Sequence, residues 1–436
     1  MPTQRFAIAG CGTAGLTAAI TLARLGHRVS LFERAEEPRA VGAGILLQPS
    51  GLQVLDALGL RDEVSARASR VDRLDGRNQH DRLVMDVRYD DLVPGAHALG
   101  VHRANLLHVL YQTALSVGVE IMHNSDISEF SDPCGPQVSL TLTDGTRHAG
   151  FDALVIANGT HSHLRNQLPI KQSMTPYPWG ALWHISSVPG LASSALRQHY
   201  NNAKVMIGLM PSGLLPGTEK PCQSFFWSLK VKDHAAWQAQ PLAAWKEQVC
   251  THWPQTEPLV AALQQHDQLQ LAVYADVRLQ RWNHGRVVVI GDAAHGMSPQ
   301  LGQGANLALV DGWELAAAVL ARNEISEAFA YYSKHRRAHL RFYQLASRAL
   351  TPLFQSDRGY GLLRDNLFCA ANALPYSRRQ ALRTVAGLKT GLLFERGLLL
   401  SPLPIATAPA SDAKPLALMH ALSDESPPDN SHCASD

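Results

Sequence analysis

The chain has 436 residues, of which 46% are hydrophobic and 17% charged, and its 39 basic and 37 acidic residues leave a formal net charge of +2. This length predicts two or three domains, since one domain typically takes about 100 to 200 residues. A balance so close to neutral argues against a dedicated nucleic-acid-binding protein, because such proteins carry a concentrated basic surface.

The cysteines and the apolar runs bound the cellular setting. The six cysteines are scattered, without a CxxC pair and without histidines at the spacing of a zinc site. We therefore expect free thiols and no metal. The start of the chain lacks the pattern of a signal peptide, and no run reaches the roughly 18 to 20 apolar residues of a membrane span. A cytoplasmic protein without a transmembrane segment is the expectation.

The first 170 residues have the pattern of an α/β fold. A short apolar run at Phe6–Ala9 is followed by glycines, a helical pattern over Leu16–Leu25 and a second strand at Val29–Phe32. These three elements predict a βαβ unit of about 30 residues. Further along we expect a helix at Asn105–Ser116, strands at Val119–His123 and Ala153–Ala157, and a hairpin that begins at Val138–Leu142 and turns at Asp144-Gly145.

The middle of the chain has a different texture. From about Lys171 to Asn283, short alternating apolar and polar runs lie between turn-rich stretches, which is typical of an antiparallel sheet. Arg70–Val87 has a similar texture, so we expect it to join that sheet. A strand at Val287–Ile290 and a long helix at about Gly304–Arg322 return to the α/β pattern, and the chain after about Ser326 is mainly helical to Leu400.

The first motif is Gly10-Cys11-Gly12-Thr13-Ala14-Gly15, between the first strand and its helix, with Glu33 at the end of the second strand. Glycines here allow a tight turn and the close approach of a pyrophosphate to the backbone, at the positive end of the helix. Glu33 can accept hydrogen bonds from a ribose, and Arg34 follows it. The pattern predicts dinucleotide binding but leaves FAD and a nicotinamide dinucleotide both open. The residues assigned to the cofactor are Gly10, Gly12, Thr13, Ala14, Gly15, Glu33 and Arg34.

The second motif favours FAD. The strand Val287–Ile290 ends in Gly291-Asp292, and the stretch from Pro299 to Asn306 then opens a helix. Asp292 can accept hydrogen bonds from a polyol such as ribitol, while the start of the helix would stabilise the negative charge of a reduced flavin. The cofactor residues predicted here are Asp292, Pro299, Gly302, Gly304, Ala305 and Asn306.

With these motifs in this order, the sequence resembles the FAD-dependent aromatic hydroxylases, the group A flavoprotein monooxygenases that include para-hydroxybenzoate, salicylate and ubiquinone-pathway hydroxylases. The resemblance covers roughly Arg5 to Arg322. A third stretch, from Asp152 to Gly159 with Ser162 and Arg165 beyond it, is similar to the family's Asp-Gly motif. In the family that motif contacts FAD and is implicated in NAD(P)H use. Asn158 stands where the family has an aspartate, so the charge is absent.

Two shorter matches add to the resemblance. Val41-Gly42-Ala43-Gly44-Ile45 is similar to the loop that passes close to the flavin, which implies a role for Gly44. His102-Arg103-Ala104-Asn105-Leu106 is similar to the segment whose arginine, here Arg103, approaches the FAD phosphates or the ribityl chain. Arg103 alone could equally be a solvated surface charge. Leu46 and Leu47 follow the loop and are either substrate-pocket residues or ordinary core leucines.

The resemblance implies a reaction. NAD(P)H reduces the flavin, O₂ adds to give a C4a-hydroperoxide, and its distal oxygen is transferred to an electron-rich carbon. The predicted function is an FAD-dependent monooxygenase that uses NADPH or NADH to hydroxylate an aromatic or other electron-rich small molecule. The alternatives are a flavin-dependent reductase, dehydrogenase or halogenase on the same fold, and a non-catalytic FAD-binding scaffold in a biosynthetic complex, which Asn158 would favour.

No catalytic base stands out in the sequence. The candidates are His184 and Tyr274, on strands of the expected substrate sheet, and His295, which follows the Gly-Asp motif. Each residue type is more often structural in such a position. The segment Ser377–Leu393 combines basic and apolar residues at helical spacing, so it could lie on a membrane surface. A helix that packs on the main body, with its charges outside, is the favoured interpretation.

The expected architecture is therefore an α/β Rossmann-type FAD domain with an inserted, mostly antiparallel substrate domain and a helical C-terminal segment. The FAD-binding domain is discontinuous and takes residues 1–69, 98–170 and 280–345. The substrate domain takes residues 70–97 and 171–279, the helical segment residues 346–400, and a disordered tail residues 401–436.

Overall fold

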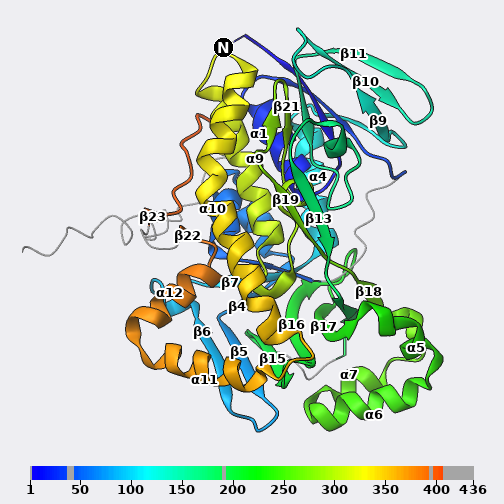
Figure 1. Cartoon of the computed structure of the whole chain (residues 1–436), viewed down its shortest axis with the longest axis vertical. Helices are drawn as coiled ribbons and strands as arrows, with labels where there is room; N and C mark the ends of the chain where they lie inside the picture. The colour runs from blue at the N-terminus through cyan, green and yellow to red at the C-terminus, as the bar shows by residue number, and fades with distance from the viewer. Residues whose placement is uncertain (1, 37–43, 189–192, 392–395, 406–436) are drawn as a thin grey trace, which may run out of the picture.

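The computed structural model describes residues 2–36, 44–188, 193–391 and 396–405. Its upper half in Figure 1 is built on a six-stranded sheet with the order β20-β21-β12-β1-β2-β8. Neighbouring strands from β21 to β8 are parallel, and β20 is an antiparallel edge strand. The strands are β1 (Arg5–Ala9), β2 (Arg28–Phe32), β8 (Glu120–Met122), β12 (Ala153–Ile156), β20 (Asn283–His284) and β21 (Val287–Val289).

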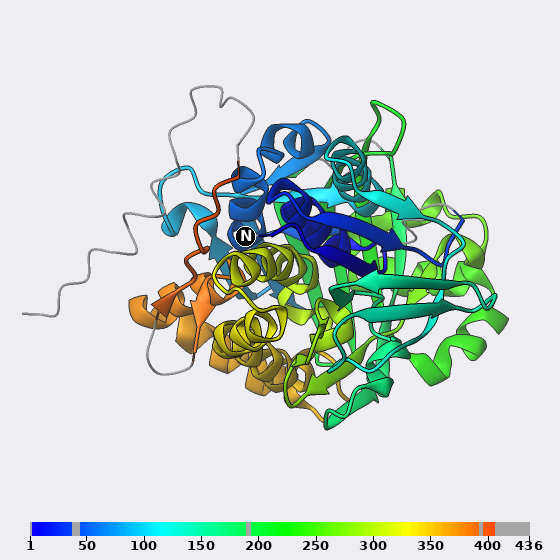
Figure 2. The same cartoon turned by 90° about the horizontal axis from the view of Figure 1, so that it is seen from above.

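The central strands of this sheet are covered on both faces. β12 and β21 are buried along their whole length, as expected of apolar strands in a parallel sheet. Helix α1 (Thr13–Arg24) packs against α9 (Gly304–Leu320), and Figure 2 shows α9 and α10 (Ile325–Phe354) nearly end-on beside α1. The two helices approach closely because Gly312 of α9 has no side chain, and Thr21 Oγ1 donates a hydrogen bond to its carbonyl (3.1 Å). The predicted βαβ unit and the predicted helix from Gly304 are confirmed.

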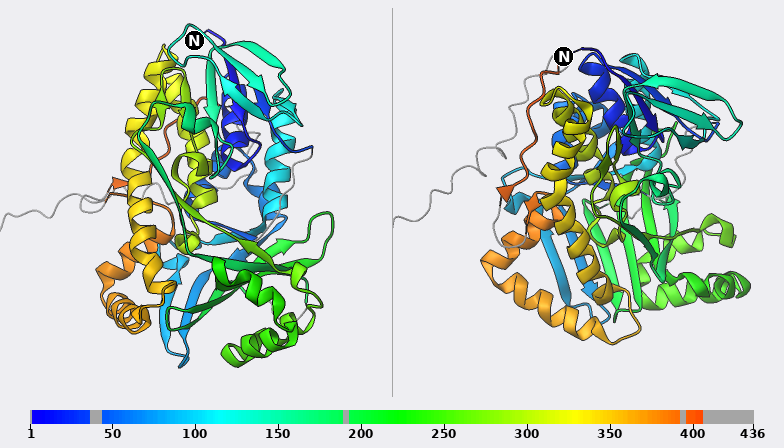
Figure 3. Two further views of the ribbon diagram at one scale, coloured as in Figure 1. Left: turned by 45° about the vertical axis from the view of Figure 1, so that its right-hand side comes forward. Right: turned by 45° about the horizontal axis from the view of Figure 1, so that its top comes forward.

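The lower half holds a seven-stranded sheet with the order β18-β14-β17-β16-β15-β5-β6 (Figure 3). Every neighbouring pair is antiparallel except β15 with β5. That pairing brings the segment 73–88 into the sheet formed by the later strands, although the domain boundaries stay a prediction. The strands are β5 (Arg73–Asn78), β6 (Leu83–Arg88), β14 (Trp179–Ser186), β15 (Ala195–Asn201), β16 (Val205–Leu214), β17 (Pro221–Lys230) and β18 (Gln270–Ala272).

Three short helices cover the outer face of this sheet, and the sequence patterns did not reveal them. They are α5 (His234–Ala239), α6 (Leu242–His252) and α7 (Glu257–Ala261). Trp237 and Trp245 pack there against Phe225 and Trp227 of β17, which makes a second apolar core separate from the main one. Helices of five to eleven residues show too few turns for a clear helical period.

Smaller sheets complete the connection between the two halves. The sheet β3-β7-β4 consists of β3 (Gly44–Leu47), β7 (Ala98–His102) and β4 (Ala68–Val71), and β13 (Gln172–Pro176) pairs with β19 (Ala275–Leu279). A third sheet has the order β11-β10-β9, with β9 (Ile127–Phe130), β10 (Val138–Leu142) and β11 (Arg147–Phe151). The hairpin predicted at Asp144-Gly145 is present, and Gly145 has the positive φ (87°) that such turns require.

The C-terminal region differs from the prediction in two respects. Helix α10 runs without a break through residues 345 and 346, where we expected one segment to end and another to begin. The helices α2 (Pro49–Ala57), α3 (Arg61–Ser65), α4 (Arg103–Ser116), α11 (Tyr360–Ala373) and α12 (Pro375–Val385) complete the helices named here. The helical region ends at Val385 rather than Leu400, because Gly387 adopts φ 81° and the chain continues as β22 (Lys389–Thr390) paired with β23 (Arg396–Gly397).

The tail also begins later than predicted. Ser401 donates through its N–H (2.9 Å) and its Oγ (2.7 Å) to the buried carboxylate of Glu314 on α9, and Ile405 is buried. Residues 401–405 are therefore fixed on the main body, because Glu314 needs partners in an apolar helix. The rest of the expected tail lies outside the described residues.

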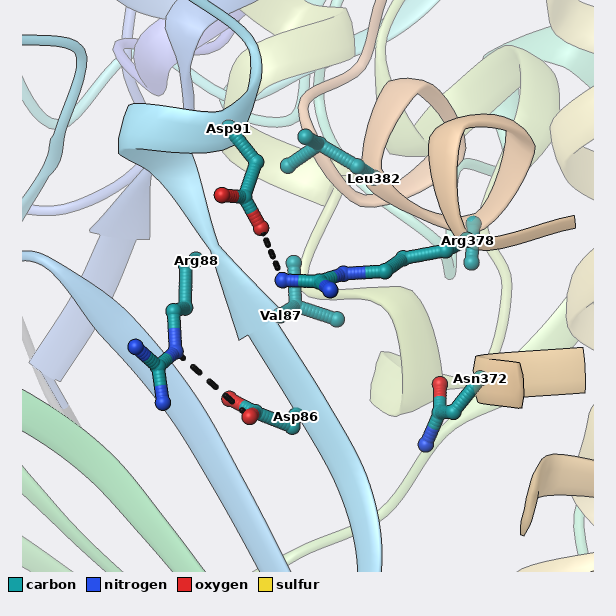
Figure 4. A pocket seen from close by; sticks show the side chains of 8 residues that line it. Asp86, Val87, Arg88, Asp91, Asn372, Arg378 and Leu382 are labelled. Carbon is teal, nitrogen blue, oxygen red and sulfur yellow. Dashed lines mark hydrogen bonds and ion pairs between the residues drawn. The ribbon is translucent and has the colours of Figure 1, made fainter. Parts of the chain in front are cut away.

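Helix α12 packs on the main body, as the favoured interpretation of Ser377–Leu393 had it, but Arg383, one of the charges expected outside, is buried. Leu382 is buried, and Figure 4 shows Arg378 paired with Asp91 beside a small surface pocket between β6 and the α11–α12 pair. The last residues of that segment lie outside the described residues. Among the described helices, none is both long and apolar enough to cross a lipid bilayer.

Because Trp245 lies in the second core, its loss should destabilise the protein more than the loss of an exposed aromatic side chain. Trp245→Ala removes a side chain that is 1% exposed and should lower the free energy of unfolding by about 3–5 kcal/mol. Tyr376→Ala removes one that is 74% exposed and should change it by less than about 0.5 kcal/mol. Urea unfolding of both variants measures the difference, and equal losses would contradict the assignment of Trp245 to a core.

Candidate active site

Three glycine-containing turns meet at the carboxyl edge of β1, β12 and β21. Gly10 has φ 104°, and a Cβ on it would lie 2.7 Å from Ala157 O at the end of β12. Gly291 follows β21 with φ 60°, and a Cβ on it would lie 2.8 Å from Ala14 Cβ. Both positions therefore demand glycine, through backbone strain and through lack of space. Segments about 150 and 280 residues apart form one site because parallel strands end at the same edge.

The start of α1 is open to an anion. Gly12 is its N-cap, no side chain caps the helix and no acidic residue stands in its first turn. A Cβ on Gly12 would meet no atom within 4 Å, whereas one on Gly15 would lie 2.0 Å from Gly10 O. The backbone is thus free in front of the turn and tightly packed behind it. This arrangement fits a pyrophosphate on the helix N-terminus.

The Glu33 carboxylate fixes the turn after β1. Its Oε2 accepts the N–H of Cys11 (2.8 Å) and its Oε1 accepts the N–H of Ala35 (3.0 Å). Each oxygen keeps a lone pair for a further donor such as a ribose hydroxyl. Burial, together with the charge of Glu33, raises the pKa of the Cys11 thiol to about 12, so this cysteine is not a nucleophile. Arg34, the residue after Glu33, is exposed.

The second motif forms the opposite wall. Asp292 begins α8 (Asp292–His295) with an exposed side chain, and a Cβ on Gly304 would have Asp292 Oδ1 as its nearest neighbour, at 3.9 Å. Gly302 is left-handed (φ 60°) after Pro299–Leu301, and no side chain caps the start of α9. The aspartate and the helix N-terminus therefore face the same space.

Asn306 has a different position from its neighbours in the motif. It is fully buried, its Oδ1 accepts the N–H of Gln48 (2.8 Å), and its Nδ2 donates to Leu46 O (3.0 Å). The side chain thus ties β3 to α9. Leu46 and Leu47 are themselves buried in the main apolar core, which favours the core interpretation over the pocket one.

The Asp-Gly segment joins the same edge. Asn158 Oδ1 is buried, and none of the described residues gives it a hydrogen bond. Arg165 is buried too, and its Nη1 donates to Thr160 O (2.6 Å) and to Ala293 O (3.3 Å). Arg165 therefore links this segment to the helix that follows Gly291.

A buried carboxylate, which the sequence analysis missed, lies beneath the second motif. Asp311 Oδ2 accepts the N–H of Gly291 (2.9 Å) and His295 Nε2–H (2.5 Å), and its Oδ1 accepts Arg336 Nη2 (2.9 Å). Burial alone would raise the pKa of Asp311, but His295, Arg336 and these hydrogen bonds outweigh it and hold the pKa well below its usual range. The one signal in the sequence is an aspartate within a helix that is mostly apolar. His295, a candidate base, is buried and uses its Nε2 to bond Asp311.

The buried contacts continue to His339. Its Nε2 lies 2.9 Å from Gly387 O, and its Nδ1 lies 2.5 Å from Arg336 Nη1. Because a carbonyl only accepts and a guanidinium only donates, His339 must be neutral with its proton on Nε2. Burial and the Arg336 charge lower the pKa of His339 well below its usual value, which agrees with that assignment.

The other two candidate bases, His184 and Tyr274, lie on opposite sides of β14. His184 lies opposite Phe225, on the face that α5–α7 cover, and its Nδ1 donates to Gln268 O (2.9 Å). Trp183 lies opposite Phe226 on the other face, where its Nε1 donates to the hydroxyl of Tyr274 (3.0 Å). The geometry therefore disfavours His184 as a base at the glycine motifs.

The face that carries Trp183 contacts the start of β3. Ser224 shares this face because it lies two residues from Phe226, and its Oγ accepts the N–H of Gly44 (2.9 Å). Burial raises the pKa of Tyr274 to about 12, although the nearby charge of Arg103 opposes the rise. Tyr274 is therefore a hydrogen-bond donor at neutral pH and not a base. Residues 41–43 of the expected flavin loop lie outside the described residues.

Glycine turns at the carboxyl edge of a parallel sheet, in a chain that also forms a second, mostly antiparallel sheet, are typical of a dinucleotide-dependent oxidoreductase. Residues 3–342 match the family described as FAD binding domain. The chain is 31% identical over 340 residues to a probable 2-heptyl-3-hydroxy-4(1H)-quinolone synthase from Rhodococcus erythropolis, which covers 77% of this chain and 85% of the relative. It is 30% identical over 348 residues to 3-amino-4-hydroxybenzoate 2-monooxygenase from Streptomyces cremeus, with 73% and 79% covered.

Solved structures agree with these relatives. The tetrameric form of 2-methyl-3-hydroxypyridine-5-carboxylic acid oxygenase superposes with a TM-score of 0.71 at 25% identity, over 88% of this chain and 97% of that one. The chain belongs to the FAD-dependent aromatic monooxygenases, the group A flavoprotein family. It is an enzyme that uses FAD, and NAD(P)H is the typical electron donor of the family. The predicted fold class, cofactor and reaction class are confirmed.

The neutral state of His339 predicts a pH dependence of stability. Since its pKa is lower in the folded than in the unfolded chain, the unfolded chain takes up the proton first, and stability is lost as pH falls below about 6.5. His339→Gln offers an amide donor and acceptor but does not titrate. The variant should lose up to about 1.4 kcal/mol less per pH unit than the wild type between pH 6 and pH 5.

Urea unfolding of wild type and His339→Gln across this range measures the difference in slope. Several other histidines titrate as well, so only the difference between the two profiles is diagnostic. Parallel profiles would mean that His339 does not titrate differently in the two states.

Proposed function

We propose that the enzyme hydroxylates a nitrogen-bearing aromatic ring that also carries a hydroxyl or oxo group, with NADH or NADPH as the reductant. Three similar proteins support this substrate class. They are named for a hydroxyquinolone, an aminohydroxybenzoate and a hydroxypyridine carboxylic acid, each with nitrogen in or on a hydroxylated ring. The bound FAD would accept two electrons from NAD(P)H and use them to activate O₂, so that one oxygen atom enters the ring and the other leaves as water.

The cofactor assignments follow the geometry of the edge. We assign the pyrophosphate to the first turn of α1, a ribose to Glu33, the ribityl chain to Asp292 and the flavin ring to the start of α9. Arg34 and Arg103 would flank the phosphates, and Asn306 would position Gly302 and β3. The main contacts would come from Gly10, Gly12, Thr13, Ala14, Gly15, Gly44, Pro299, Gly302, Gly304 and Ala305. In this proposal, residues 1–69, 98–170 and 280–345 form the FAD-binding domain, and residues 70–97 and 171–279 the substrate domain.

We base the position of the substrate on the hydrogen bond from Gly44 N–H to Ser224 Oγ. It fastens the strand after the flavin loop to the sheet face that holds Trp183 and Phe226. The ring centroids of Trp183 and Phe226 lie 5.0 Å apart, and Tyr274 is bonded to the first of them. We place the substrate ring against this aromatic wall, opposite the start of α9. Such a wall would exclude water from the reacting flavin.

Tyr274 is the residue we assign to orientation. Its oxygen accepts the Trp183 N–H, which leaves its own proton free to donate to a hydroxyl or oxo group on the ring. Because its pKa is raised to about 12, it keeps that proton throughout the physiological range.

Tyr274→Phe tests this role. The variant should keep FAD, lose about tenfold in kcat/KM for the substrate, and divert NAD(P)H consumption to hydrogen peroxide. Tyr200→Phe is the control, since the buried hydroxyl of Tyr200 donates to Gln198 Oε1 (2.7 Å) within β15 and not to a residue of the aromatic wall. An unchanged ratio of product to NAD(P)H in Tyr274→Phe would remove Tyr274 from the substrate site.

Asp292→Ala tests the cofactor assignment. Loss of a charged acceptor for the ribityl chain should weaken FAD binding by about 10- to 100-fold, which corresponds to about 1.5–3 kcal/mol. Asp81→Ala removes a carboxylate of the β5–β6 turn that is 80% exposed and should leave FAD affinity unchanged. Equal FAD dissociation constants for the two variants, measured by fluorescence quenching, would refute the assignment.

The substrate class is tested by a panel of alkylquinolones, aminohydroxybenzoates and hydroxypyridine carboxylates. One of these classes should accelerate flavin reduction and yield a product heavier by one oxygen in mass spectrometry. If the flavin is reduced but every compound leaves only hydrogen peroxide, the proposed substrate class is wrong.

A further inference from the structure

The end of helix α12 reaches back to the flavin motifs, although it lies beyond the residues that the family match covers, 3–342. We call residues 384–388 the C-terminal turn. The last carbonyls of a helix have no partner within the helix and need donors from elsewhere. Here four consecutive carbonyls each receive one. The donors are Tyr343 OH to Thr384 O (2.9 Å), Gln303 Nε2 to Val385 O (2.6 Å), Ser50 N–H to Ala386 O (3.0 Å) and His339 Nε2 to Gly387 O (2.9 Å).

The first connection leads directly to the start of α9. Gln303 is the residue before Gly304, where α9 begins, and its side chain is 2% exposed. Its amide is held by Val385 O, so the C-terminal turn fixes the residue that precedes the helix N-terminus. Ser50, the donor to Ala386, lies in the first turn of α2, two residues after Gln48, which Asn306 of α9 holds.

The second connection leads to the Gly291–Asp292 turn through side chains that are almost fully buried. Gly387 O accepts His339, His339 accepts Arg336, Arg336 donates to Asp311, and Asp311 accepts the N–H of Gly291. At each step of this path the donor and the acceptor are defined, because His339 is neutral, and the charges of Arg336 and Asp311 neutralise each other. The C-terminal turn is therefore bonded to both parts of the second motif.

Gly387 makes this contact possible. It has φ 81°, and a Cβ on it would lie 1.9 Å from Ser50 Oγ and 2.8 Å from Gln303 Oε1. Any other residue would strain the backbone and push the turn away from both side chains.

We propose that the C-terminal turn is a structural part of the flavin site, whose residues position Gln303 and the Gly291–Asp292 turn so that they can bind FAD. Thr384–Leu388 are positioning residues and need not touch the flavin. The inference rests on the proposed assignment of FAD to the second motif. It extends the site to a segment that lies past residue 342, where the family match ends.

Gly387→Ala in the full-length protein is the direct test. Displacement of the turn should weaken FAD binding by about tenfold or more and shift both the visible spectrum and the midpoint potential of the bound flavin. Gly26→Ala is the matched control, because Gly26 also has a positive φ (88°) but a Cβ there would meet no atom within 4 Å. The control should lose some thermal stability and keep the FAD dissociation constant, spectrum and potential of the wild type.

A second pair of variants keeps the test decisive if Gly387→Ala does not fold. Gln303→Met preserves the length of the side chain but removes the donor to Val385 O, so FAD binding should weaken by about tenfold. Gln344→Met is the matched control, because it removes a buried amide donor to a backbone carbonyl, Val277 O (2.6 Å), outside both the flavin motifs and the C-terminal turn, and it should keep the wild-type FAD dissociation constant.

The possible outcomes distinguish a failure of the FAD assignment from a failure of the role proposed for the C-terminal turn. If the wild type itself fails to bind FAD, the proposed cofactor assignment fails. If the wild type binds FAD, and Gly387→Ala and Gln303→Met bind it with the same dissociation constant and midpoint potential, the C-terminal turn is a remote packing element and the inference is overturned.

Discussion

The carboxylate of Asp311 is the interaction on which the site depends. A buried charge of this kind is costly unless it is paired, and removing one partner of a buried pair costs about 3–5 kcal/mol. Here the partners are the N–H of Gly291, His295 and Arg336, which belong to the second motif and to α10. Because the charge must be satisfied, the turn after β21 can adopt one position relative to α9 and α10. The opening between Asp292 and the start of α9 follows from that position.

The second constraint is the contact of the seven-stranded sheet with the smaller sheet β3-β7-β4. The six-stranded sheet provides the glycine turns, and the seven-stranded sheet presents one face with Trp183 and Phe226 while α5–α7 cover the other. Gly44 of β3, in that smaller sheet, donates its N–H to Ser224 Oγ of β17 in the seven-stranded sheet. In the proposed site a planar substrate ring would lie against that face, and its side chains would decide which ring is accepted.

The sequence predicted what depends on local pattern. The glycine motifs, the βαβ unit, the alternating strands and the family could be identified because each has a fixed spacing. The chain from His295 through Asp311 and Arg336 to His339 could not, since its members are tertiary neighbours with no characteristic spacing. The helix end at Val385 and the fixing of Ser401 by Glu314 were missed for the same reason, as both depend on donors and acceptors from distant elements. His184 was a plausible base until the register of β14 placed it on the far face.

In the proposed assignment, the turns after β1 and β21, the start of α9 and the C-terminal turn form one FAD site. Hydrogen–deuterium exchange of the full-length protein with and without FAD tests it most directly, because it reports backbone protection segment by segment. We expect FAD to slow exchange at residues 10–15, 291–295, 302–306 and 384–388 together. Protection confined to other segments, or to the first turn alone, would contradict it.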